Sequence, residues 1–261
     1  MNIAVFDLET NGLQGSSVLS ASSLVFDPEG RVLDVFNRFY MPRERPDPYA
    51  ARIHGLTPRR ILALRGDKNA DAIYFLEDWP SLLEFWQERD VEGIVVHNLP
   101  FDTSFLPDLA QISFRWWCSM RGMAEYCLIP KRPGNVGREG GAYKWPRLSE
   151  LADCVCNSPA ALAPSMETKR LEGVMGEVQK HVSLSDCFEL YRVVSRVARH
   201  RPDLMPFLPC LTPFRPPRKT VEKINAVPQC DPVVARIADY EKKLRAAIAC
   251  RESASAGLVG I

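Results

Sequence analysis

The fold is decided by one stretch near the start of the chain, IAVFDLETNG at residues 3–12, which joins an apolar run to two carboxylates and an Asn-Gly turn. Side chains at positions i and i+2 of a β-strand project from the same face, so Asp7 and Glu9 should point the same way. Neighbouring like charges oppose each other's ionisation, and a divalent cation between such oxygen ligands would offset the repulsion. The pair is also typical of a strand that runs into an acidic turn. A metal site therefore requires further carboxylates downstream.

Composition describes an ordinary globular protein. The chain has 261 residues, of which 46% are apolar and 25% charged, enough for one large domain or a domain with an appendage. Lys and Arg number 33 against 32 Asp and Glu, so bulk charge neither supports nor excludes a nucleic-acid partner. The first residues carry acids and no long apolar run, which speaks against a signal sequence or a membrane span.

The eight cysteines lack paired spacing, which favours a reduced, cytoplasmic setting. Cys154 and Cys156 could suggest zinc, but no second Cys or His pair completes a set of four ligands. We interpret these cysteines as buried free thiols.

Further strands and helices follow the first stretch. The patterns predict strands at 18–26, 32–40, 92–96 and 114–118, the first two continuing from the opening strand as an antiparallel meander. Helices are predicted at 78–88, 120–127, 148–154 and about 183–199. His54, in a loop ahead of a helix capped by Thr57, is expected to be structural.

Two later stretches supply more acids. The fourth strand runs directly into HNLPFD at residues 97–102, where Asn98 at the cap and Pro100 in the first turn place Asp102 at a helix start. In HVSLSD at residues 181–186, Ser183 and Asp186 resemble a capping box. At about 100° per residue, His181 and Asp186 cannot share one helical face, so His181 should lie on the preceding loop.

Residues 131–147 combine basic and aromatic side chains on a Gly-rich stretch. Such a loop suits a phosphate backbone with unstacked bases, and it is equally typical of a solvated surface. Beyond residue 200 a Pro-rich connector leads to an amphipathic helix at 231–250. We therefore divide the chain into residues 1–200 and 201–261. The final helix could pack on its own chain, which we favour, pair with a second copy, or dock a partner such as a polymerase.

Together the three acidic stretches resemble one family. FDLETNG (6–12), HNxxFDxxF (97–105) and HxxxxD (181–186) are similar, in this order, to the motifs of the DEDDh group of 3′→5′ exonucleases. That group includes the proofreading epsilon subunit of DNA polymerase III, RNase T and oligoribonuclease. The resemblance covers about residues 1–200. It implies an RNase H-like α/β fold, with a mixed five-stranded sheet flanked by helices and followed by the Pro-rich connector and helical extension.

The resemblance also implies the chemistry. Asp7 would bridge two divalent cations, Mg²⁺ with Mn²⁺ as a substitute, while Glu9 and Asp186 hold one and Asp102 the other. Histidine exchanges protons near neutral pH, and His181 would be the general base for the attacking water.

The implied substrate is the 3′ end of single-stranded or frayed DNA, released as nucleoside 5′-monophosphates. Thr10, Gly12 and Leu13 would contact the terminal nucleotide, with Asn98 and Phe105 lining the same pocket. For the last two, helix cap and core are the alternative roles. Short RNA is the nearest rival substrate, and a non-catalytic nucleic-acid-binding or scaffold module is the rival of another class. No membrane partner is expected.

Three features depart from the family pattern. Ser183 replaces a usual Ala, Cys118-Ser119 replaces a common Asp-Thr pair, and the connector from about residue 152 to 180 is long. These departures bear on substrate preference, since none removes an expected metal ligand.

Overall fold

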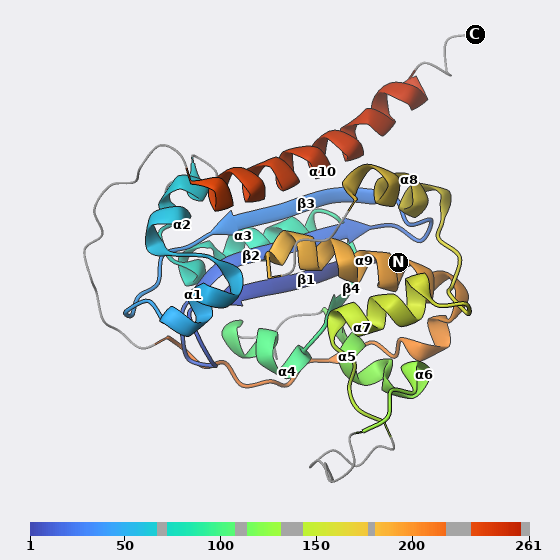
Figure 1. Ribbon diagram of the computed structural model, residues 1–261, viewed down its shortest axis with the longest axis horizontal. Helices are drawn as coiled ribbons and strands as arrows, with labels where there is room; N and C mark the ends of the chain where they lie inside the picture. Colours follow the sequence, from blue (N-terminus) through green and yellow to red (C-terminus); the bar gives the residue numbers. More distant parts are fainter. Residues whose placement is uncertain (67–71, 108–113, 132–142, 177–180, 218–230, 257–261) are drawn as a thin grey trace.

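The structure is a computed structural model that describes residues 1–66, 72–107, 114–131, 143–176, 181–217 and 231–256. Across these residues the chain forms a mixed sheet in the order β3-β2-β1-β4-β5-β6, flanked by helices (Figure 1). The strands are β1 (Asn2–Thr10), β2 (Val18–Phe26), β3 (Val32–Phe39), β4 (Val91–Val96), β5 (Arg115–Cys118) and β6 (Leu208–Pro209). β1 to β3 form the predicted antiparallel meander, while β4 is parallel to β1 and β5 to β4.

The five predicted strands are all present, and β6 extends the expected five-stranded sheet by one. β6 comes from the Pro-rich connector, which the sequence predicts to be stiff and non-helical, and it pairs antiparallel with β5. Pro209 has no N–H to donate, so a strand containing it belongs at the edge of a sheet. The Pro-rich connector therefore supplies the edge strand of the sheet, next to β5.

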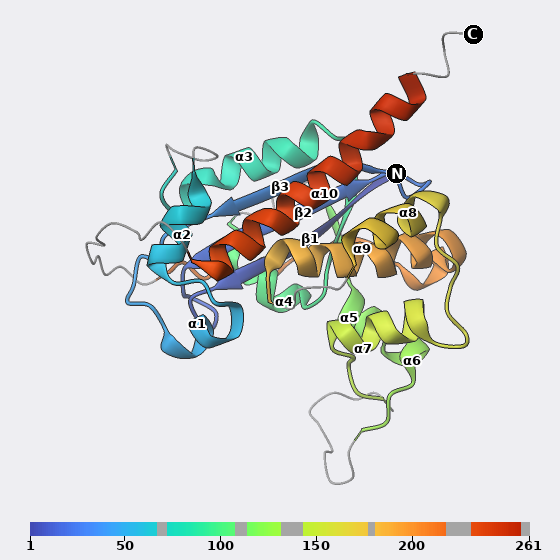
Figure 2. The ribbon, with the colours of Figure 1, turned by 45° about the horizontal axis from the view of Figure 1, so that its top comes forward.

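Helices cover both faces of the sheet (Figure 2). α3 (Phe75–Gln87) packs on one face, where Trp86 meets Phe6 edge-on at a ring-centroid distance of 5.3 Å. α9 (Ser183–His200) lies on the other face with Val5 and Leu184 in one core cluster. Because side chains alternate along a strand, Asp7 and Glu9 share the face of Val5 and point toward α9.

Several shorter helices accompany α3 and α9. They are α1 (Pro48–His54), α2 (Pro58–Arg65), α4 (Leu99–Asp102), α5 (Ser119–Gly122), α6 (Ala124–Cys127), α7 (Leu148–Ala152) and α8 (Met166–Met175). Several predicted helix bounds differ from those observed. α3 begins at Phe75, because the Glu77 carboxylate accepts the N–H groups of Ile73 and Tyr74 and so caps an earlier start. The predicted helix at 120–127 is divided into α5 and α6.

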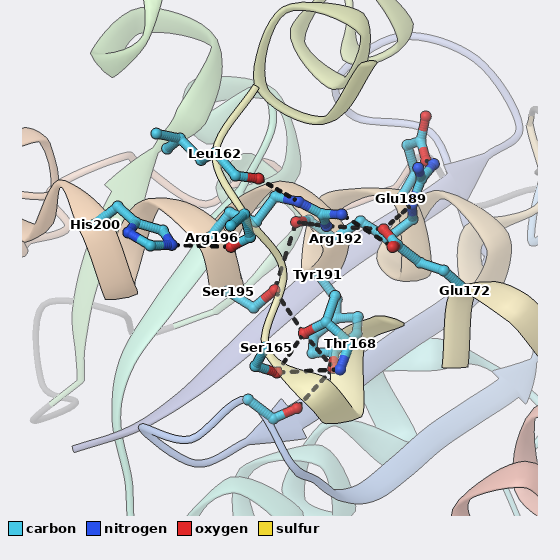
Figure 3. A network of polar contacts seen from close by, with 12 residues as sticks. Leu162, Ser165, Thr168, Glu172, Glu189, Tyr191, Arg192, Ser195, Arg196 and His200 are labelled. Atoms are coloured by element: carbon cyan, nitrogen blue, oxygen red, sulfur yellow. Dashed lines mark hydrogen bonds and ion pairs between the residues drawn. The ribbon is translucent and has the colours of Figure 1, made fainter. Parts of the chain in front are cut away.

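A polar network holds the segment between α7 and α9, which includes α8, against α9 (Figure 3). Glu172 on α8 accepts from Arg192 at 2.7 Å and from Arg196 at 2.9 Å. The Tyr191 hydroxyl donates to the Gly30 carbonyl at 2.6 Å and lies 3.1 Å from Thr168 Oγ1. Buried charges need such pairing, so α8 is held on α9 by specific contacts.

The C-terminal helix α10 (Pro232–Ala256) packs on its own chain, which confirms the favoured interpretation. It contacts β3, α2 and α8, and it buries Ile237, Tyr240 and Leu244. Glu241 accepts a hydrogen bond from Asn37 of β3 at 2.7 Å. The division of the chain at residue 200 stays a prediction.

Within the described residues, no helix combines the length and apolar character needed to cross a membrane.

Candidate active site

β1 and α4 bring three acids together. Glu9 is 9% exposed and Asp102 5% exposed, while Asp7 is half-buried. α4 follows β4 directly, and its first turn holds Asp102 near Leu8 and Asn98, whose backbone groups oppose the rise in the pKa of its carboxylate. The strand-to-helix turn therefore fixes the predicted position of Asp102 beside β1. Asn98 occupies the N-cap position, but its side chain makes no capping hydrogen bond.

The start of α9 brings the remaining two residues to β1. A carboxylate oxygen of Glu9, a ring nitrogen of His181 and a carboxylate oxygen of Asp186 all lie within 4.8 Å of one another. His181 is exposed on the loop before α9, as predicted, with a φ of 60°. Its backbone N–H donates to Asp186 Oδ2 at 3.1 Å. This contact orients the Asp186 carboxylate toward the entry of the helix.

The predicted capping box of Ser183 and Asp186 was wrong. Val182 occupies the N-cap position, and Ser183 is already helical and buried. The Ser183 hydroxyl lies 2.9 Å from that of Ser20 and 2.7 Å from that of Ser22. The Ser183 hydroxyl therefore links α9 to β2, a role that the sequence pattern did not predict.

The cluster concentrates negative charge. Desolvation, followed by repulsion from Asp186, raises the pKa values of both Asp7 and Glu9 well above their usual range. Burial raises the pKa of Asp102 to about 7, against the opposing effect of its backbone hydrogen bonds. A set of hard oxygen donors that disfavour each other's charge fits a divalent cation such as Mg²⁺ or Mn²⁺.

Two cavities, each of about 530 Å³, adjoin the cluster. The first, called the Leu13 cavity, is lined by Leu8, Glu9, Thr10, Gly12, Leu13, Asp47, Tyr49, Ala50, Ile53, His54 and Phe101. The second, called the Trp145 cavity, is lined by Asp7, His97, Asn98, Met120, Trp145, Pro146, Arg147, Leu148, Ser149, His181, Asp186 and Glu189. Both volumes fall in the range of small-ligand sites, about 300–1,000 Å³.

The predicted substrate residues divide between the two cavities. Thr10, Gly12 and Leu13 line the Leu13 cavity, where Leu13 is 83% exposed. Asn98 lines the Trp145 cavity instead. Phe105 lines neither cavity: it is 2% exposed and belongs to the core cluster under α3.

Sequence reasoning missed several cavity residues. Phe101, four residues before Phe105, supplies one aromatic ring of the Leu13 cavity. Tyr49 and Ile53 are exposed at 70% and 44% and lie four residues apart on α1. Apolar residues at that spacing share a helical face, which was a usable signal. Residues 132–142, most of the predicted basic loop, lie outside the described residues, whereas Trp145 and Arg147 lie within them.

His54 has the contacts of a structural residue. The Leu56 N–H donates to Nδ1 at 2.9 Å, so the ring proton resides on Nε2, which lies 3.2 Å from the Thr10 carbonyl. Burial, with repulsion from His181 as a smaller effect, lowers the pKa of His54 to about 4. The neutral ring thus braces the end of β1 from inside the Leu13 cavity.

The sequence matches no protein-family model and no curated protein. Solved structures do resemble it. The zinc-bound form of the E. coli exonuclease I complex with single-stranded DNA has a TM-score of 0.50 and 18% identity, covering 78% of this chain and 42% of that one. The E. coli exonuclease I complex with a dT13 oligonucleotide gives the same four values.

Exonuclease X in complex with 5′-overhanging duplex DNA has a TM-score of 0.46 and 19% identity, covering 77% of this chain and 93% of that one. The chain thus spans less than half the length of the exonuclease I chains, at 42% of each. At 18% sequence identity, the similarity to exonuclease I shows a shared fold and nothing further. The chain shares the mixed α/β fold of the exonuclease I structures.

Proposed function

We propose that the chain is a metal-dependent 3′→5′ exonuclease that releases nucleoside 5′-monophosphates from single-stranded or frayed DNA. The observation that carries the proposal is the meeting of Glu9, His181 and Asp186 within 4.8 Å, from elements about 170 residues apart in the sequence. Asp7 and Asp102 lie close enough to this group for repulsion between carboxylates to raise the pKa of Asp7. The family motifs require the same five residues.

Asp7, Glu9, Asp102 and Asp186 would hold the cations. Divalent ions held there would stabilise the attacking and leaving oxygens of an in-line displacement at phosphorus. The raised pKa values of Asp7 and Glu9 support this role, because they mark carboxylates whose charge is costly without a cation.

His181 would take the proton from the attacking water at a ring nitrogen. Its side chain is exposed, so solvent can reach it, and its backbone is fixed by the hydrogen bond to Asp186. Positioned proton transfer of this kind contributes about 10²- to 10⁴-fold to a rate. The exposed Leu13 would pack against the terminal base in the Leu13 cavity.

Single-stranded DNA is the favoured substrate, because the exonuclease I structures with this fold are complexes with single-stranded DNA. The active-site geometry gives no reason of its own to reject a 2′-hydroxyl, so RNA is the alternative to test.

The test uses 5′-labelled DNA and RNA oligonucleotides of one sequence, with Mg²⁺ or with chelator. We expect a ladder of stepwise shortened DNA products with Mg²⁺ and none with chelator. Faster shortening of RNA than of DNA would make RNA the substrate. No shortening of either polymer would favour a binding or scaffold module, and internal cuts would contradict an exonuclease.

A further inference from the structure

The carboxylate cluster has a cavity on each side. Glu9 lines the Leu13 cavity, while Asp7 and Asp186 line the Trp145 cavity. The cavities share none of their lining residues, and both have volumes of about 530 Å³. A phosphodiester held at the carboxylates carries one nucleoside on each of its two ester oxygens. The Leu13 cavity can receive one of them, which leaves the Trp145 cavity for the other.

The wall of the Trp145 cavity offers a surface for a flat ring. The half-buried indole of Trp145 lines it together with the apolar side chains of Met120 and Leu148. The guanidinium of Arg121 packs over the same indole at 4.7 Å from its centroid. Aromatic side chains of this kind stack with any base, since every base has a π-face.

The segment that carries Trp145 is held in place by hydrogen bonds. His97 Nε2 lies 3.1 Å from the Pro146 carbonyl, and His97 Nδ1 lies 3.0 Å from Ser119 Oγ. Lys144, which precedes Trp145, has its Nζ 2.6 Å from Glu150 Oε1. A binding surface fixed before the ligand arrives loses less conformational freedom on binding.

The lining of the Trp145 cavity also holds a cation and an amide among its acids, Asp7, Asp186 and Glu189. Arg147 is exposed and lines the Trp145 cavity, and Asn98 adds an exposed amide. A guanidinium is well suited to phosphate oxygens. The cavity therefore combines a stacking ring, a cation and an amide next to the expected position of the scissile phosphate.

We propose that the Trp145 cavity binds the nucleotide on the 5′ side of the scissile bond, with its base stacked on Trp145 and its phosphate beside Arg147. The Leu13 cavity then takes the 3′-terminal nucleotide. This inference rests on the proposed exonuclease function and adds where the penultimate nucleotide lies. Trp145 acts as a binding residue that contacts the strand left behind by cleavage.

The test measures kcat/KM for the wild-type chain and for Trp145→Ala on three DNA oligonucleotides. One is intact, one has an abasic residue at the penultimate position, and one has an abasic residue at the 3′ terminus. Stacking on a protein aromatic is worth about 5- to 150-fold per base. We expect Trp145→Ala to lower kcat/KM by that factor on the intact and 3′-abasic substrates and to change it little on the penultimate-abasic one. Trp145→Phe should restore most of the loss.

Other patterns contradict the proposal. An equal loss on all three substrates would make Trp145 structural, and a loss cancelled only by the 3′-abasic residue would place the terminal nucleotide in the Trp145 cavity. Thermal unfolding of Trp145→Ala shows whether the variant is folded. If it is not, Trp145→Phe and Trp145→Leu on the same substrates separate stacking from bulk. Failure of the exonuclease proposal looks different, because the wild-type chain would then shorten none of the oligonucleotides.

Discussion

The hydroxyl oxygen of Ser183 lies 2.7 Å from that of Ser22, and this contact ties the first turn of α9 to β2. Asp186 is three residues further along the same helix, and Ser22 is the β-ladder partner of Asp7. Ser22 in turn donates to Asn37, which donates to Glu241 of α10. A chain of polar contacts therefore links the C-terminal helix to the residues that frame the cluster.

Removal of the Ser183 hydroxyl should destabilise the fold. Ser183→Ala leaves buried hydroxyls of β2 short of a partner, at a cost of about 1–3 kcal/mol in unfolding free energy. A double-mutant cycle with Ser22→Ala, measured by urea denaturation, should show a coupling free energy of about 0.5–3 kcal/mol. Strictly additive effects would mean that the two side chains do not support each other.

Asp7→Asn should abolish cleavage and leave the fold intact. Without cations, the loss of one charge from a cluster that raises the pKa of Asp7 should keep or increase the melting temperature at pH 8. The unfolding free energy of the wild-type chain should rise by about 2.7 kcal/mol when Mg²⁺ is present at 100 times its dissociation constant. That of the variant should rise much less. Thermal melts with Mg²⁺ and with chelator measure both. An unfolded variant would show that Asp7 is chiefly structural.

Asp102 should make the metal-free protein sensitive to pH. Its folded-state pKa is about 7, well above the usual aspartate value of 3.8, so the folded state holds a proton that the unfolded state releases. The stability this proton contributes is complete below about pH 4 and is lost as pH rises through 7. His54, with a pKa lowered to about 4, acts in the opposite direction below about pH 6.5.

The comparison that isolates Asp102 is therefore between variants. In chelator, the melting temperature of Asp102→Asn relative to wild type should be higher at pH 8 than at pH 5. A difference that does not change with pH would mean that Asp102 is ionised in the folded protein across this range.

His181→Ala should lower kcat by about 10²- to 10⁴-fold while the Mg²⁺ concentration for half-maximal activity changes little. The ring lies within 4.8 Å of Glu9 and Asp186, so a ligand role is the competing explanation. Mg²⁺ titrations of activity distinguish the two, because loss of a ligand would weaken Mg²⁺ binding as much as turnover. His200→Ala, at the far end of α9 and exposed, is the matched control.

Glu241→Leu should loosen α10. The Glu241 carboxylate is buried and accepts from Asn37 and Arg245, so its removal leaves both donors without that acceptor. We expect a loss of about 1–3 kcal/mol in unfolding free energy, and faster amide exchange along α10. Glu241→Gln keeps a side-chain carbonyl acceptor and should lose less. Equal losses would point to the charge itself.

The sequence by itself determined the five strands from β1 to β5 and the order of the acids along the chain. Alternation in β1 predicts that Asp7 and Glu9 share a face, and the Asn98-Pro100 turn predicts Asp102 at a helix start, because both features depend on local backbone geometry. The placement of His181 ahead of α9 follows in the same way from the 100° turn of a helix.

Only the tertiary structure decided what these elements meet. Phe101 and Phe105 are equivalent in the sequence pattern, yet packing under α3 buries Phe105 and leaves Phe101 in the Leu13 cavity. Ser183 has the local signature of a cap, but contact with β2 gives its hydroxyl different partners. The period of a segment specifies which side chains share a face. The partner of that face depends on how distant elements pack, and no local pattern carries that information.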